Sequence, residues 1–183
     1  MHNYRFTSHR LGFRNWQHAD LAPMAAMNAD PAVMEFFPGT QTEEQTAEFI
    51  QRMQDQYAAT GYCYYAVDTL IDNNFIGFIG LSDKTFDADF TPCVDIGWRL
   101  GTHAWHKGYA TEGAHRCLEY GFNELGLAEI VAMAPQVNLR SIHIMHKLGM
   151  SKRCDFAHPL LPSDARLRQC VLYGVSRDVH RYP

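Results

Sequence analysis

The chain of 183 residues has no apolar run long enough to cross a membrane, no signal-peptide pattern, no internal repeat and no low-complexity tract. These absences argue against a membrane-spanning, secreted or solenoid protein. Because 46% of the residues are hydrophobic, the chain can bury a full core, and we expect one domain over residues 1–183. We expect this domain in the cytoplasm, without a membrane partner.

Cysteines are few: five of them, scattered and without a C-x-x-C pair. Such spacing does not suit a disulfide framework, so it predicts buried free thiols in a reducing compartment. Two His-x-x-His pairs occur, His103 with His106 and His143 with His146. Neither pair has further ligands at supporting spacing, and the first lies in a loop assigned below to phosphate. We therefore expect no metal.

An excess of basic charge is also missing, since the formal net charge is −4. Nucleic-acid binding draws on a clustered basic surface, and no such cluster is found in the sequence. We therefore expect no nucleic-acid partner. An amine or another cationic partner suits the charge better.

The most informative segment that is present covers residues 105–112, with the sequence W-H-K-G-Y-A-T-E. It follows residues 93–100, which alternate in polarity as a half-buried strand does, and it precedes apolar residues at helical spacing. Gly108 lets the backbone approach a ligand, and the first amides of a helix lack intrahelical partners. The junction therefore predicts a phosphate site. An ordinary strand-loop-helix connection is the alternative.

A second cluster follows, in which a strand at residues 128–134 leads to N-L-R-S-I-H-I-M-H-K-L-G-M at residues 138–150. Together the two clusters resemble the GNAT acyl-CoA N-acyltransferases, in which a W-x-K-G-Y-A-T-E loop binds the coenzyme pyrophosphate and an N-x-x-S…K-L-G segment follows the next strand. Trp105 stands where many GNAT loops have glutamine or arginine. This variant is typical of the branch that resembles ribosomal-protein N-terminal acetyltransferases, and residues 10–14, 19–21 and 30–38 extend the resemblance.

The resemblance implies an α/β (α+β) fold: a mixed, mostly antiparallel central sheet of about seven strands, with helices on both faces and a splayed strand pair that holds the coenzyme. The local patterns agree with it. A capping box at residues 42–45 predicts a helix that ends at Gly61, and Gly97 is expected at a bulge or a close approach. Strands are expected at residues 9–15, 62–70, 75–82, 93–100, 128–134, 151–158 and 168–176.

The activity that the resemblance implies is transfer of an acyl group, most simply acetyl, from acyl-CoA to a primary amine that attacks the thioester directly. The acceptor is either a protein N-terminal amine or a small-molecule amine, and the enzyme is a monomer or a homodimer. The alternative is a catalytically silent acyl-CoA-binding module. Acetyl-CoA contacts are expected at Trp98, Arg99, Leu100, His106, Lys107, Gly108, Tyr109, Ala110, Thr111 and Asn138.

For the departing thiolate the resemblance suggests the Ser141 hydroxyl, whereas a helix cap formed with Asn138 is the structural alternative. Two carboxylates compete as the general base. Asp95 lies on the strand beside the coenzyme slot, where an ion pair with Arg99 is the rival interpretation. Glu35 lies in an interhelical loop, where neighbouring aromatic rings would raise its pKa unless the carboxylate is solvated.

The acceptor side is expected to be formed by two loops that are rich in aromatic, proline and leucine residues. Phe36 and Phe37 belong to the first loop, and Leu160 belongs to the second, at residues 159–162. We interpret them as an apolar rim around the acceptor. Packing of these loops against the core is the alternative.

Overall fold

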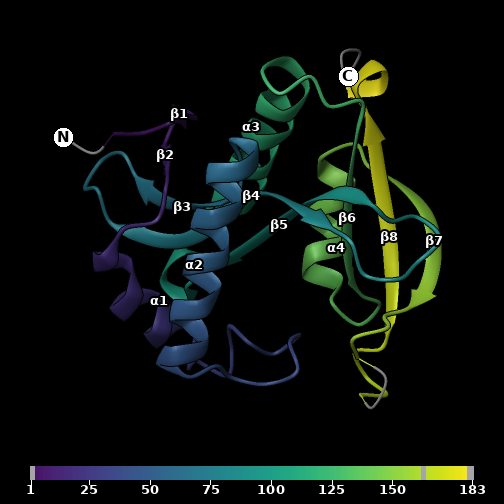
Figure 1. Ribbon diagram of the computed structural model, residues 1–183, viewed down its shortest axis with the longest axis horizontal. Helices are drawn as coiled ribbons and strands as arrows, with labels where there is room; N and C mark the ends of the chain where they lie inside the picture. Colours follow the sequence, from purple (N-terminus) through teal and green to yellow (C-terminus); the bar gives the residue numbers. More distant parts are fainter. Residues whose placement is uncertain (1–2, 162–163, 181–183) are drawn as a thin grey trace.

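A computed structural model describes residues 3–161 and 164–180, which build one eight-stranded sheet with helices on both faces (Figure 1). The sheet order is β1-β2-β3-β4-β5-β6-β8-β7, and every neighbouring pair is antiparallel except β5 and β6. The strands are β1 (Phe6–Thr7), β2 (Leu11–Arg14), β3 (Tyr64–Thr69), β4 (Phe75–Lys84), β5 (Cys93–Leu100), β6 (Glu129–Pro135), β7 (Ser151–Ala157) and β8 (Gln169–Ser176). The mixed, mostly antiparallel sheet is thus confirmed. Its eighth strand, β1, is too short for a sequence pattern to mark.

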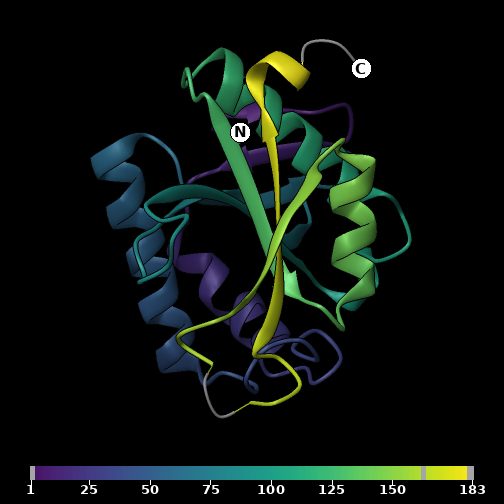
Figure 2. The same cartoon turned by 90° about the vertical axis from the view of Figure 1, so that its right-hand side faces the viewer.

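The helices are α1 (Leu21–Asn28), α2 (Glu43–Thr60), α3 (Tyr109–Asn123), α4 (Leu139–Lys147) and α5 (Arg177–His180). Neighbouring residues of β4 show that α2 and α3 cover opposite faces, because side chains alternate along a strand. Phe78 packs 5.2 Å from the Phe49 ring of α2, whereas Ile79 lies against Gly113 of α3. Helix α4 contacts α3, and Figure 2 shows α4 on the other side of the sheet from α2. None of the helices in the described ranges is long and apolar enough to span a membrane.

Helix α2 has the predicted ends. The Thr42 hydroxyl accepts from the amide of Gln45, and the Gln45 side chain accepts from the amide of Thr42, which forms the capping box. Gly61 ends the helix with a φ of +82°, a conformation that costs glycine little. The cap at Thr42 thus sets where the loop after α1 ends, and Gly61 sets where the chain leaves α2 for β3.

A buried ionic cluster fixes the start of α1 to the sheet. The Arg14 guanidinium on β2 donates to both oxygens of Asp20 and both oxygens of Asp68, at 2.7 to 2.8 Å. At the other end of α1, the fully buried Asn28 donates to Thr46 of α2. The cluster and Asn28 thus hold α1 and the loop after it over one face of β5.

Strands β5 and β6 separate along their length, as predicted. Eight residues of β5 pair with β4, but only Asp95 pairs with β6, opposite Val131. Beyond Asp95, the backbone groups on this edge of β5 have no strand partner. The separation opens the sheet at its centre, next to the loop that leads into α3.

The cysteines are all free thiols, but they are not all buried. Cys63, Cys117 and Cys170 lie in the core, whereas Cys93 is half-buried and Cys154 is exposed on β7. The prediction of uniformly buried thiols is therefore wrong for the last two, because Cys93 is the first residue of β5 and Cys154 lies on the edge strand β7, where six of the seven residues are exposed.

Candidate active site

Two adjoining cavities lie where β5 and β6 separate. The larger, of about 470 Å³, extends from β5 to the loop before α3, and the smaller, of about 290 Å³, extends toward β3 and β4. Six residues line both cavities, so the two form one continuous site: Phe36, Phe37, Trp98, Arg99, Asn138 and Ser141. We call them the coenzyme-side and the acceptor-side cavity.

The loop before α3 has the backbone conformation of an anion cradle. His106 and Gly108 both have positive φ, at +60° and +79°, and Gly108 is the N-cap of α3. Such a turn directs successive backbone amides to one side, next to the free amides at the helix start. The Trp105 indole anchors the loop by donating to the Leu100 carbonyl at 2.8 Å. The loop thus meets the requirement for binding a phosphate.

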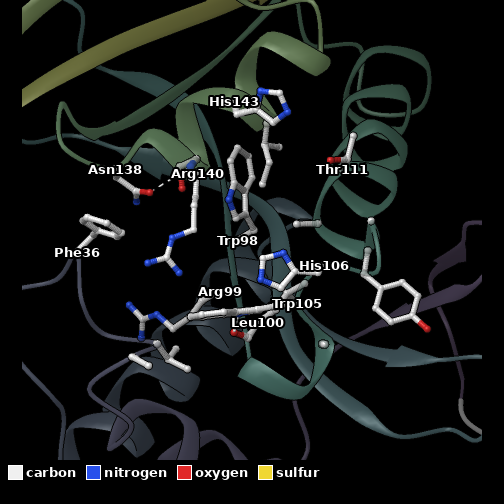
Figure 3. Close-up of a pocket in the computed structure, with 18 of the residues that line it drawn as sticks. Phe36, Trp98, Arg99, Leu100, Trp105, His106, Thr111, Asn138, Arg140 and His143 are labelled. Atoms are coloured by element: carbon white, nitrogen blue, oxygen red, sulfur yellow. Dashed lines mark hydrogen bonds between the residues drawn. The ribbon is translucent and has the colours of Figure 1, made fainter.

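Most of the residues predicted to contact the coenzyme line the coenzyme-side cavity, many of them labelled in Figure 3. Lys107 is the exception, because its side chain is exposed and does not form part of the wall. The cavity wall contains the cations Arg99, Arg140 and Lys147, and no carboxylate among the described residues. A polyanionic coenzyme suits this lining.

Asp95 is a buried carboxylate in the wall of the acceptor-side cavity, only 4% exposed. Its Oδ2 accepts a hydrogen bond from the Tyr64 hydroxyl and lies 4.0 Å from the Lys84 ammonium. Its Oδ1 is buried and has no hydrogen-bond partner in the described parts of the chain. Burial raises the pKa of Asp95 to about 6, although the Lys84 charge, the Tyr64 hydrogen bond and the backbone amide of Met133 oppose the increase.

Tyr64 reaches Asp95 by lying across two glycines. Tyr64, Gly80 and Gly97 are in register on the adjacent strands β3, β4 and β5. A Cβ atom on Gly97 would lie 2.9 Å from Cζ of the Tyr64 ring, so a larger residue would displace the ring. Gly97 is therefore the site of a close approach, one of the two roles expected for it, and the ring continues across the sheet to Asp95.

Arg99 does not pair with Asp95, contrary to the rival interpretation of an ion pair. Its guanidinium donates to the side chain of Asn28 at 2.7 Å and lies 4.0 Å over the Phe37 ring and 5.4 Å over the Phe78 ring. The Arg99 side chain lines both cavities, and burial lowers its pKa to about 10. The guanidinium thus keeps its charge at neutral pH.

Asn138 and Ser141 both line the two cavities, but only Asn138 uses its side chain as a helix cap. The Asn138 Oδ1 accepts from the backbone amide of Ser141 at 3.1 Å (Figure 3). The Ser141 hydroxyl makes no hydrogen bond to another residue in the described ranges. The cap therefore leaves this hydroxyl available to a ligand.

Glu35 lies at the rim, outside the lining of both cavities. Its side chain is 45% exposed and forms an ion pair with Arg140. The neighbouring aromatic rings do not desolvate it, because Phe36 packs on the guanidinium groups of Arg140 and Arg166 and not over the carboxylate. The solvated-carboxylate alternative describes Glu35.

The two predicted acceptor loops differ. Phe36 and Phe37 line both cavities, which agrees with a position at the acceptor side. Leu160 is 71% exposed and lines neither cavity, and Pro162 of the same loop lies outside the described residues.

Within the described residues, no group of three or more His, Cys, Asp or Glu side chains is arranged to hold a metal ion.

Sequence reasoning missed three residues of the site: Tyr64, Lys84 and Arg140. Tyr64 and Lys84 reach Asp95 from β3 and β4, and their approach depends on strand register, which no local pattern reveals. Arg140 belongs to the second sequence cluster, residues 138–150. It lies between Asn138 and Ser141 at the start of α4, and this position in the sequence could have indicated that it lies near the ligand expected at those two residues.

Comparison with known proteins agrees with this geometry. The family model described as an acetyltransferase (GNAT) domain matches residues 10–151, and the chain belongs to this family of acetyltransferases. An uncharacterized N-acetyltransferase, YnaD of Bacillus subtilis, is 27% identical over 151 residues, 82% of this chain and 84% of its own length. The prediction of an acetyl-CoA-dependent N-acetyltransferase is confirmed at the level of the family.

Solved structures share the fold over nearly the whole chain. A GNAT-family acetyltransferase from Bacillus anthracis has a TM-score of 0.79 and 26% identity, covering 94% of this chain and 98% of its own. Spermidine N-acetyltransferase from Vibrio cholerae, solved with CoA and spermine, has a TM-score of 0.75 at 15% identity (93% and 98% covered). Ribosomal-protein-S5-alanine acetyltransferase from Vibrio fischeri has a TM-score of 0.75 at 17% identity (94% and 96% covered). These neighbours confirm the predicted GNAT fold.

Proposed function

We propose that this chain transfers an acetyl group from acetyl-CoA to a primary amine, with Asp95 as the general base. The observation that carries the proposal is the position of Asp95, a buried carboxylate with a pKa of about 6 in a cavity that joins the coenzyme-side cavity. A base needs a pKa near the working pH to accept a proton and release it again. Glu35 is solvated and paired with Arg140, which favours Asp95.

Coenzyme binding follows from the fit between the cavity and a phosphate-bearing thioester. The amides at His106 and Gly108 and at the start of α3 would hold the pyrophosphate. The unpaired edge of β5 beyond Asp95 would hydrogen-bond the amides of the pantetheine arm as an added strand does. Bound acetyl-CoA supplies the activated acyl carbon, and its reaction with an amine requires no metal.

The reaction gives each polar side chain a defined task. The amine nitrogen bonds to the acyl carbon, its proton passes to the Asp95 carboxylate, and the carbon-sulfur bond then breaks. The Ser141 hydroxyl is placed to donate a hydrogen bond to the departing thiolate, which takes a proton from solvent and leaves as a free thiol, while Asp95 releases the amine proton to solvent. The Tyr64 hydroxyl orients the Asp95 carboxylate through Oδ2, and Oδ1 is the carboxylate oxygen without a hydrogen-bond partner in the described ranges.

Steady-state release of coenzyme thiol from acetyl-CoA, measured against a panel of amines and peptides, tests the proposal. The acid limb of kcat/KM should follow one ionisation near pH 6, because the base is active only when Asp95 is deprotonated. Asp95→Asn should lower kcat by about a hundredfold or more. Asp87→Asn, which removes an exposed carboxylate, is the matched control and should leave kcat unchanged.

Two results would contradict the proposal. Asp95→Asn with kcat within a factor of about three of the wild type would remove Asp95 as the base. Binding of acetyl-CoA without thiol release for any acceptor would instead favour the catalytically silent acyl-CoA-binding module.

We further propose that residues 1–183 act as one catalytic domain in the cytoplasm. The support is the single sheet that joins strands from both ends of the chain, together with five free thiols. A monomer or a homodimer is compatible with this arrangement.

A further inference from the structure

We propose that the acceptor is an amine that also carries an anionic group, a carboxylate or a phosphate, which binds the Arg99 guanidinium. The proposal rests on the proposed function, since it names the acceptor class of the same site. It starts from the charge of Arg99 in the cavity wall.

Arg99 is a cation with no carboxylate partner among the described residues. Its hydrogen bond goes to the neutral Asn28, and its Nε is buried without a hydrogen bond. The rings of Phe37 and Phe78 pack on the guanidinium and remove it from water without neutralising it. A largely buried charge is costly unless it is paired, so a ligand that brings an anion gains the most from this position.

The other charged groups that line the acceptor-side cavity already have partners. Asp95 is the only carboxylate that lines either cavity within the described residues, and it lies beside Lys84. Arg140 is paired with Glu35 at the rim. Among the described residues, Lys84 and Arg99 are the cations in the wall of the acceptor-side cavity, and Arg99 is the one that lacks a counter-ion. A polyamine would add positive charge to a site with one carboxylate, so this lining opposes it.

The proposed phosphate cradle at His106 and Gly108 and the Arg99 guanidinium lie in different parts of the wall of the coenzyme-side cavity. Trp98 and Arg99 are consecutive on β5, so their side chains leave opposite faces of the sheet. The Arg99 face is covered by the Asn28 and Phe37 segment. Figure 3 shows the Arg99 guanidinium on the Phe36 side of the Trp105 ring, with Thr111 in the first turn of α3 on the other side.

Asp95 and Arg99 lie on the same face of β5, four residues apart, and both line the acceptor-side cavity. Their Cα atoms are about 13 Å apart along an extended strand, and the Tyr64 ring lies over Gly97 between them. An acceptor with its amine at Asp95 and its anion at Arg99 would lie along β5 beside the Tyr64 ring. The two ends would together orient the amine toward the thioester.

Matched pairs of acceptors that differ only in the anion test this inference. The pairs are α-amino acids and ω-amino acids of increasing length with their amides, and O-phosphoethanolamine with ethanolamine. Spermidine is the polycationic comparison. In a thiol-release assay with acetyl-CoA, the best anionic acceptor should exceed its neutral counterpart in kcat/KM by about thirtyfold or more. The pair with the largest ratio distinguishes a carboxylate from a phosphate.

Variants of Arg99 connect this preference to one side chain. Arg99→Gln should abolish the preference mainly by raising the acceptor KM, by a larger factor than the acetyl-CoA KM, and Arg99→Lys should retain part of the preference. Arg153→Gln on β7 removes one positive charge away from both cavities and should keep the wild-type ratio.

The inference fails if neutral amines or spermidine are acetylated as efficiently as their anionic counterparts, although the proposed function then stands. It also fails if Arg99→Gln, folded by circular dichroism, retains the ratio. If acetyl-CoA binds but no acceptor releases thiol, the proposed function fails and this inference fails with it.

Discussion

Replacing Asp95 with asparagine should stabilise the protein while it removes activity. The carboxylate is buried, and its pKa is raised from 3.8 to about 6. Folding therefore has to move an ionised group out of water at neutral pH. A shift of about two pKa units corresponds to about 3 kcal/mol of unfolding free energy at pH 8. Asparagine has nearly the same shape and can still accept from the Tyr64 hydroxyl.

The pH dependence gives the sharper form of this prediction. Between pH 4 and pH 6 the unfolded carboxyl is ionised and the folded one is protonated, so the wild type loses stability as the pH rises. The penalty is about 2 kcal/mol at pH 5 and about 3 kcal/mol at pH 8. The gain of Asp95→Asn over the wild type should therefore increase by about 1 kcal/mol between pH 5 and pH 8.

Urea unfolding at several pH values between 5 and 8 measures this difference, because the slope m should be the same for two proteins that expose the same surface. Asp87→Asn, which changes an exposed carboxylate, should show no such trend. The reasoning is refuted if the difference between Asp95→Asn and the wild type is independent of pH or decreases as the pH rises. That result would mean that Lys84 stabilises the Asp95 charge by more than burial destabilises it.

Two further predictions concern other residues of the site. Ser141→Ala should lower kcat by roughly ten- to a thousandfold with an unchanged acetyl-CoA KM, since the helix cap uses only its backbone amide; normal turnover would leave the hydroxyl without a catalytic role. Asn138→Ala, its control for helix stability, should cost about 1 kcal/mol in urea unfolding. Replacing Phe36 and Phe37 with alanine should raise the acceptor KM through loss of wall surface, with little change for acetyl-CoA; equal effects on both substrates would place these rings outside the acceptor site.

Elements with a strong local signal were predictable from the sequence. The strand at residues 93–100 has the predicted bounds, and the Thr42 capping box and Gly61 end α2 as expected. The separation of β5 from β6 followed from the family resemblance, and the pairing confirms it. Strand β1 was missed because two residues carry no periodicity, and its pairing with β2 is a tertiary contact.

The site was predictable where its residues are consecutive in the chain. The loop with His106 and Gly108 has the positive φ angles of a backbone turn that binds anions. Gly108 and its position before a helix already indicated this in the sequence. The partners of Asp95 were not predictable, because Tyr64 and Lys84 reach it across three strands. Of the two alternatives for Glu35, the solvated carboxylate describes the structure, since adjacency to aromatic residues in sequence does not imply burial against them.

The central claim is that the loop before α3 binds acetyl-CoA, and calorimetric titration of Gly108→Asp with acetyl-CoA tests it most directly. Gly108 has a φ of +79°, and an aspartate there would bring strain and negative charge to the proposed phosphate cradle. Gly126→Asp is the matched control, because Gly126 has a similar φ of +71° and an exposed position beyond the other end of α3. We expect the control to bind acetyl-CoA like the wild type and Gly108→Asp to bind it at least about a hundredfold more weakly. Wild-type affinity in a folded Gly108→Asp variant would contradict the account and place the coenzyme elsewhere.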